Sequence, residues 1–395
     1  MTTLRADDVD RFRRDTPGTE DVIHLNNAGS ALPPTQVTDT VLDYLREESV
    51  RGGYETAAAH AERIQGVYGS IARFLGADAA DISVTDSATR SWQAVFYAMR
   101  FQPGDRILTC RSEYASNAIA YLQVARRTGA LVEVVEDDAS GQLDVADLER
   151  RVDDRVKLIA ITHVPTQGGL VNPAEEVGAI AERAGIPFLL DACQSAGQLD
   201  LDVRRLRCDA LSGTGRKYVR GPRGTGFLYV HPRLRERIEP AMLDLHSATW
   251  TAPDRYEVAP DGRRFETWER NYGLVLGLGA AVDYAMAVGL PAIEERVTAL
   301  AARLRADLSQ VPGVTVHDQG RRRCGIVTFS VAGIDAAEVK NHLSAATINT
   351  STTHAESYQY DQEVRRLPAM VRSSVHYYNT EDELRTLVET VEKLT

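Results

Sequence analysis

The sequence predicts an α/β fold built on a mainly parallel sheet, and three observations indicate it. Short apolar runs alternate with helix-length amphipathic segments from residue 81 to residue 230, as in strand–helix–strand units. Several runs, 158–162 and 186–190 among them, show no polar alternation, which is typical of strands buried on both faces of a parallel sheet. Asp191 directly follows one of these runs, at the edge where open α/β sheets bind ligands.

The remaining elements follow from local patterns in chain order. Residues 1–20 are expected to form a short helix and a loop, and residues 24–29 a short strand that runs into a turn. Apolar residues at helical spacing mark five segments: 35–51, 57–75, 175–184, 272–288 and 293–308. Six apolar runs are expected to be strands: 81–85, 106–109, 158–162, 186–190, 325–330 and 370–375. Residues 243–264 are polar, with two prolines and little periodicity, so a loop is expected there.

Composition and charge limit the class of protein. An apolar content of 43% and a charged content of 26% are those of a globular protein, and the net charge of −11 argues against a general nucleic-acid binder. The charged first 15 residues lack the apolar core of a secretory signal. Asp283 and four glycines interrupt the weakly polar stretch 272–290, which favours a buried helix over a membrane span. The four cysteines show no C-x-x-C pairing, so neither a metal site nor a disulfide framework is indicated and a cytoplasmic protein is expected.

The stretch 186–226 carries the residues that predict the chemistry. Asp191 ends a strand, and the small residues of 212–216 deliver Lys217 to a turn. A lysine amine can form a Schiff base with an aldehyde, and a carboxylate can keep a pyridine nitrogen protonated. Both tasks are required by pyridoxal 5'-phosphate (PLP), and the 26 positions between Asp191 and Lys217 leave room for a helix and a return strand.

Two motifs in this stretch resemble those of the fold-type I, class V aminotransferase family, whose best-known members are the cysteine desulfurases. They are D-x-x-Q at Asp191 and Gln194, and S-G-T-G-R-K at 212–217, followed by G-P-R-G-T-G. The resemblance extends from about His24 to the C-terminus. It implies the PLP fold-type I architecture, with a mainly parallel seven-stranded sheet in a large domain and a smaller α/β C-terminal domain. We expect an N-terminal arm at 1–32 that packs on the small domain, a large PLP-binding domain at 33–276 and a small domain at 277–395.

The resemblance also implies a set of cofactor contacts. Residues matching Ala88 and Thr89 cradle the phosphate in the family, and the free N–H groups at a helix start suit an anion, although plain helix capping explains the same residues. Tyr114 matches a flat side chain, usually histidine, that stacks on the pyridine ring. A phenol ionises near about pH 10 and is a poorer proton shuttle, so the stack is either passive or handles protons differently. The implied cofactor-binding set is Ala88, Thr89, Tyr114, Thr166, Asp191, Gln194, Thr214, Arg216 and Lys217, with Lys217 and Tyr114 catalytic.

Substrate contacts are implied in the same way. Arg372 begins a segment, 372–380, that resembles the family's R-x-S-x-x-x-Y-N-T, whose arginine grips the substrate carboxylate with its guanidinium fork. Asn27 and Ala28 match a family segment that passes beside the substrate, although turn chemistry explains them equally well. Three residues of the expected loop could line the substrate pocket or lie on an ordinary surface: His246, Ser247 and Trp250. An amino-acid-like small molecule is therefore the expected substrate.

Two positions depart from the family pattern. Glu269 stands where relatives supply a threonine to the phosphate of the partner subunit in a homodimer, so that contact must be remade, by Arg270 or by Asn271. The interval 348–357 holds no cysteine, whereas desulfurases carry their nucleophilic cysteine shortly before the arginine motif. A hydroxyl cannot accept sulfane sulfur, so no persulfide-forming desulfurase activity is expected.

These observations predict a PLP-dependent C–S lyase that acts by β-elimination on an S-substituted cysteine or a cysteine conjugate. Family members of this kind include the lyase of ergothioneine synthesis and enzymes that trim cysteine-conjugated lincosamide antibiotics. Decarboxylation with oxidative deamination, as in one branch of the lincosamide group, remains an alternative, as do transamination and epimerisation. A catalytically inert PLP-fold partner protein is a further possibility, which the presence of Lys217 and Asp191 disfavours.

Overall fold

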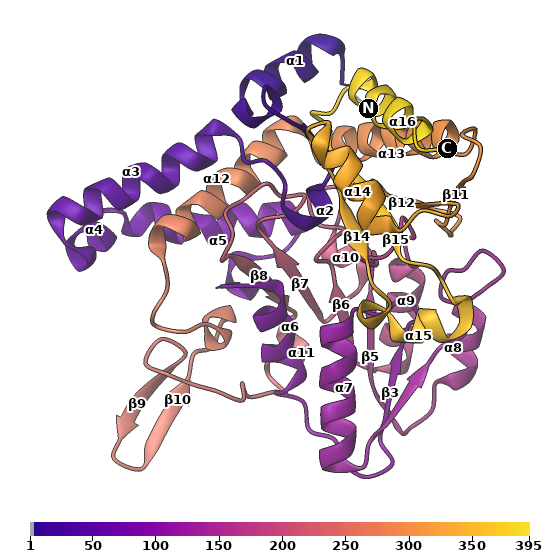
Figure 1. Cartoon of the computed structure of the whole chain (residues 1–395). Coiled ribbons are helices and arrows are strands. Elements are labelled where there is room, and N and C mark those ends of the chain that lie inside the picture. Colours follow the sequence, from indigo (N-terminus) through magenta and orange to yellow (C-terminus); the bar gives the residue numbers. More distant parts are fainter. Residues whose placement is uncertain (1–3) are drawn as a thin grey trace.

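The computed structural model describes residues 4–395 and has a seven-stranded sheet at the centre of its larger part (Figure 1). The strand order is β2-β8-β7-β6-β5-β3-β4. Strands β7, β6, β5, β3 and β4 run parallel, and β8 is antiparallel to both β2 and β7. The bounds are β2 Ile82–Thr85, β3 Arg106–Thr109, β4 Leu131–Val134, β5 Val156–Thr162, β6 Phe188–Asp191, β7 Ala210–Thr214 and β8 Gly226–Val230. The predicted mainly parallel sheet is confirmed.

Helices cover both faces of this sheet, and their apolar sides form its core. On β3, β5, β6, β7 and β8 nearly every side chain is buried, as their unalternating sequences require. The helices of this part are α3 Thr35–Arg51, α4 Gly53–Ala59, α5 Ala61–Leu75, α6 Ala88–Phe96, α7 Ala115–Thr128, α8 Val145–Arg151, α9 Ala174–Ala184, α10 Val203–Leu206, α11 Pro232–Arg235 and α12 Tyr272–Val288. The helix expected over 57–75 is two helices, because the chain leaves helical geometry at His60.

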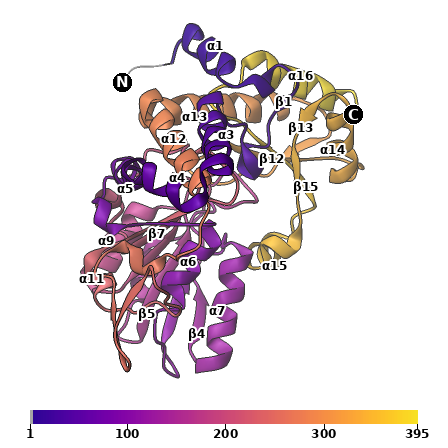
Figure 2. The same cartoon turned by 90° about the vertical axis from the view of Figure 1, so that its left-hand side faces the viewer.

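The smaller part has a four-stranded antiparallel sheet of order β11-β12-β15-β14 (Figure 2). Its elements are α13 Leu290–Leu308, β11 Val314–Val316, β12 Ile326–Val331, α14 Ala336–Ala345, β13 Ile348–Asn349, β14 Ser351–Thr353, α15 Gln359–Arg365, β15 Met370–Ser374 and α16 Glu381–Glu392. The helix α12 contains both residue 276 and residue 277, so the predicted domain boundary falls inside a helix.

The N-terminal segment contacts several elements of the smaller part. It comprises α1 Ala6–Arg14, β1 Ile23–His24 and α2 Asn27–Ser30. The strand β1 pairs in parallel with β13, and Arg13 forms a 2.7 Å ion pair with Glu383 at the start of α16. These contacts join the N-terminal segment to β13 and α16 of the smaller part.

The segment predicted as a loop contains a hairpin that extends away from the body of the molecule in Figure 1. Its strands are β9 Ala248–Ala252 and β10 Arg255–Val258, with Trp250 opposite Tyr256. The loop prediction is wrong over these residues. Both faces of the hairpin are largely exposed, so no apolar alternation marks it in the sequence.

Within residues 4–395 no single helix has both the length and the apolar composition needed to cross a membrane. The helices α12 and α13 reach that composition only as a pair, bent by 80° where they meet.

Candidate active site

A cavity of about 280 Å³ lies at the carboxyl ends of β5, β6 and β7. The ladder places Thr162, Asp191 and Ser212 side by side on these strands, so residues that follow the strands meet at one edge of the sheet. All nine predicted cofactor contacts line this cavity: Ala88, Thr89, Tyr114, Thr166, Asp191, Gln194, Thr214, Arg216 and Lys217.

Lys217 reaches the cavity from a tight turn after β7. A Cβ atom on Gly215 would lie 2.1 Å from Thr225 Oγ1, so only glycine fits this approach. Lys217 is 8% exposed, and burial lowers the pKa of its amine, with the neighbouring charges of Arg216 and Arg372 acting in the same direction. A lysine held in this way is more readily neutral, and therefore a better nucleophile and base, than one in water.

Asp191 is buried at the end of β6 with two fixed donors. The backbone N–H of Cys193 donates to Oδ1 at 2.9 Å, and Asn117 Nδ2 donates to Oδ2 at 2.9 Å. Burial raises the pKa of Asp191, while these donors and Lys217 oppose the rise. A cationic group in the cavity would favour the ionised carboxylate, as a protonated pyridine nitrogen does.

The other end of the cavity suits a phosphate group. The α6 N-terminus opens there, and Ser87 caps it by accepting from the backbone N–H of Arg90 at 3.3 Å. The first N–H groups of a helix have no intrahelical acceptors, so capping by Ser87 leaves those of Ala88 and Thr89 available to an anion. Arg216 and Arg223 line the same cavity. Capping and anion binding are thus compatible here.

Arg372 lies buried beside the cavity without an acidic partner. Its Nη1 donates to Thr166 Oγ1 at 2.7 Å, and its Nη2 donates to Asn26 Oδ1 at 3.3 Å. Within residues 4–395 its hydrogen-bond partners are neutral, and burial lowers the pKa of its guanidinium. A buried cation without a counter-charge is unfavourable, so this position suits the carboxylate of a ligand.

The two N-terminal candidates have different surroundings. Asn27 is fully buried, and its Nδ2 donates to Ser374 O at 2.7 Å while its Oδ1 accepts from Tyr378. Its side chain therefore ties the arm to β15 and does not line the cavity. Ala28 contributes its carbonyl oxygen, which accepts from Gln194 Nε2 at 3.1 Å. Sequence reasoning missed Asn26, which contacts Arg372, because neighbouring residues of the same type carry no signal of which one faces the site.

Tyr114 stands at the N-terminus of α7, and its half-exposed ring lines the cavity. Its backbone N–H donates to Glu113 Oε1 at 2.8 Å and to Thr162 Oγ1 at 3.2 Å. The cavity residues that were missed from the sequence include Asn117 and Thr162. Asn117 lies one helical turn after Tyr114, and this spacing is the one signal that could have found it.

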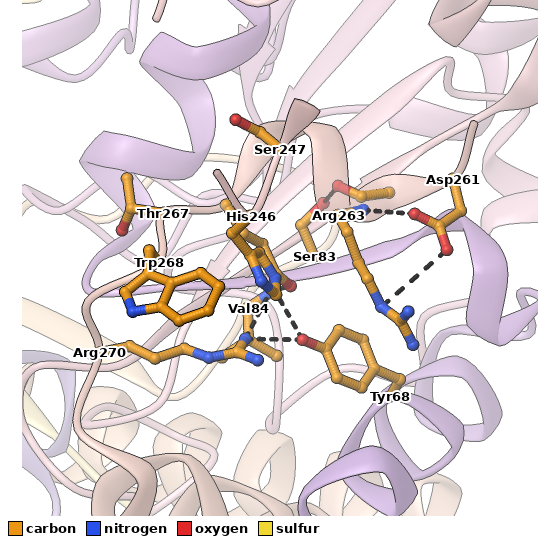
Figure 3. A network of polar contacts seen from close by, with 12 residues as sticks. Tyr68, Ser83, Val84, His246, Ser247, Asp261, Arg263, Thr267, Trp268 and Arg270 are labelled. Carbon is orange, nitrogen blue, oxygen red and sulfur yellow. Dashed lines mark hydrogen bonds and ion pairs between the residues drawn. The ribbon is translucent and has the colours of Figure 1, made fainter. Parts of the chain in front are cut away.

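The residues expected to replace the missing threonine contact are engaged within their own chain. Figure 3 shows Tyr68, His246 and Arg270 converging on one point, which is the buried carboxylate of Glu266. Asn271 caps α12 by accepting from the backbone N–H of Leu274 at 2.9 Å.

The loop candidates and Glu269 also lie apart from the cofactor cavity. Ser247 is buried against Asp244, and Trp250 is exposed on the hairpin. Glu269 lines a separate cavity of about 350 Å³. The contact that replaces the family's threonine therefore remains a prediction, and His246, Ser247 and Trp250 do not line the cofactor cavity.

His163 is a buried group that stands outside the cavity lining, and it gives the protein a pH dependence. Burial, with the nearby charge of Arg322, lowers the pKa of His163 from 6.5 to about 3. The unfolded chain takes up this proton at higher pH than the folded protein, so His163 is expected to contribute a loss of stability as the pH drops below 6.5, with a slope equivalent to about one proton. Urea unfolding at several pH values measures the slope. His163→Asn should make the slope smaller without abolishing it, because burial also lowers the pKa of His376, and equal slopes in both proteins would contradict the prediction.

The donor set as a whole fits PLP. It offers an amine, a carboxylate with fixed donors, an anion site at a helix start and a flat ring. Gln194 Oε1 is in addition buried without a hydrogen-bond partner within residues 4–395, as expected of an atom that faces a bound group.

Comparisons with known proteins identify the family of this chain. Residues 23–387 match the family model described as Aminotransferase class-V. A probable cysteine desulfurase of Methanothermobacter thermautotrophicus is 28% identical over 400 residues, covering 100% of this chain and 99% of the relative. A cysteine desulfurase of Enterobacter sp. is 30% identical over 385 residues, covering 94% and 93%. The solved apo structure of a cysteine desulfurase from Thermococcus onnurineus NA1 superposes with a TM-score of 0.91 at 28% identity, covering 100% and 99% of the two chains.

Proposed function

Because this chain belongs to the aminotransferase class-V family of PLP-dependent enzymes, we propose that it is a C–S lyase that cleaves an S-substituted cysteine or a cysteine conjugate by β-elimination. The observation that carries the proposal is the absence of a cysteine from the segment 348–357. This segment includes β14, where Ser351 pairs with Arg372. A substrate whose carboxylate binds Arg372 therefore meets hydroxyl and amide groups in this segment, and no thiol that could accept its sulfur.

One thiol does line the cofactor cavity, that of Cys193. Burial raises its pKa, although Lys217 opposes the rise. Sulfur acceptors act as thiolates, so a buried thiol of this kind is a poor persulfide carrier. The chemistry of Cys193 therefore favours the elimination reaction, in which the sulfur leaves with its substituent and is not transferred to the protein.

Seven of the predicted residues have a part in this reaction. When bound, PLP supplies an electron sink that weakens the bonds at the substrate's Cα atom. Lys217 would hold the cofactor and take the proton from Cα, and Asp191 would hold the proton on the ring nitrogen. Arg372 would orient the substrate through its carboxylate. The phosphate would be bound by the cavity's other end, at Ala88, Thr89, Thr214 and Arg216.

The reaction balances without an oxidant. The substrate loses a proton from Cα and a thiolate from Cβ, and these leave together as a free thiol. Water then hydrolyses the remaining enamine to pyruvate and ammonia. Decarboxylation with oxidative deamination instead consumes oxygen and releases carbon dioxide and an aldehyde, so the products separate the two reactions.

Product analysis tests the proposal directly. Purified protein with PLP is incubated with an S-alkyl-cysteine, with cystine and with free L-cysteine. We expect equal amounts of pyruvate and thiol from the S-substituted substrate, and no alanine from L-cysteine. Carbon dioxide with an aldehyde, a racemised or transaminated amino acid, or alanine with protein-bound persulfide would each overturn the lyase assignment. No turnover of any amino acid would favour an inert partner protein.

We also propose that the enzyme is a homodimer. Exposed apolar side chains gather between residues 242 and 268, namely Met242, Leu245, Trp250, Tyr256 and Trp268. Met242 lines the 350 Å³ cavity, which adjoins the cofactor cavity through Asp86, Gly224 and Thr225. Large exposed apolar patches favour protein contacts. Light scattering on the 43.4 kDa chain should give twice this mass, and a monomer that is fully active would contradict the proposal.

A further inference from the structure

The buried carboxylate of Glu113 lies directly behind the cofactor cavity. Glu113 is 2% exposed and does not line the cavity. Its Oε1 accepts from the backbone N–H of Tyr114 at 2.8 Å, from Asn117 Nδ2 at 3.0 Å and from Thr162 Oγ1. Its Oε2 accepts from Thr109 Oγ1 at 2.6 Å and from the hydroxyl of Tyr121 at 3.0 Å. This one carboxylate therefore joins β3, β5 and α7 by hydrogen bonds.

Asn117 connects this carboxylate to the cofactor site. It is 3% exposed, and its Nδ2 donates both to Glu113 Oε1 and to Asp191 Oδ2, at 3.0 Å and 2.9 Å. A side-chain amide nitrogen carries two N–H groups, so both are used by the two carboxylates. If Glu113 Oε1 were removed, one N–H group of this amide would lose its acceptor, and Asp191 alone would hold the amide in place.

We propose that Glu113 is a positioning residue for Asp191, acting through Asn117 to hold that carboxylate in the orientation that binds the ring nitrogen of PLP. The backbone N–H of Cys193 fixes the other oxygen of Asp191, so the Glu113–Asn117 pair completes its support. This role concerns the cofactor and not the substrate bond that is cleaved. It therefore holds or fails independently of the lyase assignment.

The chemistry of the two oxygens separates positioning from charge. Glutamine at 113 keeps an acceptor in the place of Oε1, which receives the two N–H donors of Tyr114 and Asn117. Its amide nitrogen would take the place of Oε2, which faces the hydroxyls of Thr109 and Tyr121. Hydroxyls accept as well as donate, so Glu113→Gln preserves the network while it removes the charge. Glu113→Ala removes both the hydrogen-bond network and the charge.

The test compares Glu113→Gln, Glu113→Ala, Asn117→Ala and the double variant Glu113→Ala/Asn117→Ala. Three quantities are measured on each: the Kd for PLP, the pH midpoint of the bound cofactor's visible absorbance, and Tm. We expect Glu113→Gln to bind PLP within about 3-fold of the unaltered enzyme. Glu113→Ala and Asn117→Ala should each weaken PLP binding at least about 10-fold and move the midpoint in the same direction. The double variant should be no worse than either single one, because the two residues act in one chain of contacts.

A matched control is Asp209→Ala. Asp209 is also buried, and it accepts from the backbone N–H of Phe188 at 2.9 Å at the opposite end of β6. Its loss should lower Tm and leave the absorbance midpoint unchanged. The proposal is overturned if Glu113→Ala lowers Tm in the same way with PLP affinity and midpoint unaltered, or if the two single effects add in the double variant. If Glu113→Ala fails to fold, the Asn117→Ala variant decides the question. An unchanged absorbance midpoint in that variant would exclude an action of Glu113 on Asp191 through Asn117.

Discussion

Lys217→Ala is expected to lower kcat by at least about 10³-fold without loss of the folded state. The amine of Lys217 is the group that would hold PLP and take the substrate proton, and Arg216 beside it cannot replace it because a guanidinium stays protonated. Burial lowers the pKa of Lys217, which means that the folded protein accommodates its charged form poorly. Alanine relieves that strain, so the Tm of the cofactor-free variant should equal or exceed that of the unaltered chain. Turnover of an S-alkyl-cysteine and thermal unfolding measure the two effects.

A surface lysine supplies the control for this substitution. Lys157 is exposed on β5 and donates to the carbonyl oxygen of Asp154, so Lys157→Ala removes an amine outside the cavity and should leave kcat unchanged. The absorbance of added PLP distinguishes loss of the covalent link from loss of binding. A Lys217→Ala protein that retains more than about a tenth of the activity would refute the role assigned to this amine.

The centre of the site could be predicted because its determinants are local in sequence. Asp191 follows an unalternating strand, and Lys217 follows a turn in which Gly215 has no room for a side chain. Strand ends and glycine-dependent turns can each be recognised within one short segment of the sequence. The positions of these two residues at one sheet edge then follow from the parallel ladder.

The supporting contacts could not be predicted because they depend on how distant segments pack. Asn117 and Asp191 are 74 positions apart, and Asn26 and Arg372 are 346 apart. Nothing near Asn26 distinguishes it from Asn27, yet one reaches Arg372 and the other is buried in the arm. The hairpin was missed for a different reason: its strands bury little surface, so burial imposed no pattern on their sequence.

Arg372→Ala should weaken the binding of amino-acid substrates by about 100- to 1,000-fold, the usual range for loss of a charge-assisted, paired contact. Its guanidinium is buried, engages Thr166 and Asn26, and has no acidic partner within residues 4–395. The effect should appear in the Kd for the substrate and in kcat/KM, with PLP affinity within about 3-fold of the unaltered enzyme.

Two comparisons isolate the carboxylate as the group that Arg372 binds. An S-substituted cysteamine lacks the carboxylate, so the unaltered enzyme should bind it as weakly as Arg372→Ala binds the corresponding cysteine. Arg372→Ala should change the Kd of the cysteamine itself little. Arg372→Lys keeps the charge but loses the forked guanidinium. Its Kd for the substrate should lie between those of the unaltered enzyme and of Arg372→Ala. Asn26→Ala removes one neutral contact to the guanidinium and should cost about 10-fold or less. If Arg372→Ala weakened the amine and the amino acid equally, the arginine would be supporting the cavity wall through Thr166, and the substrate would be held elsewhere.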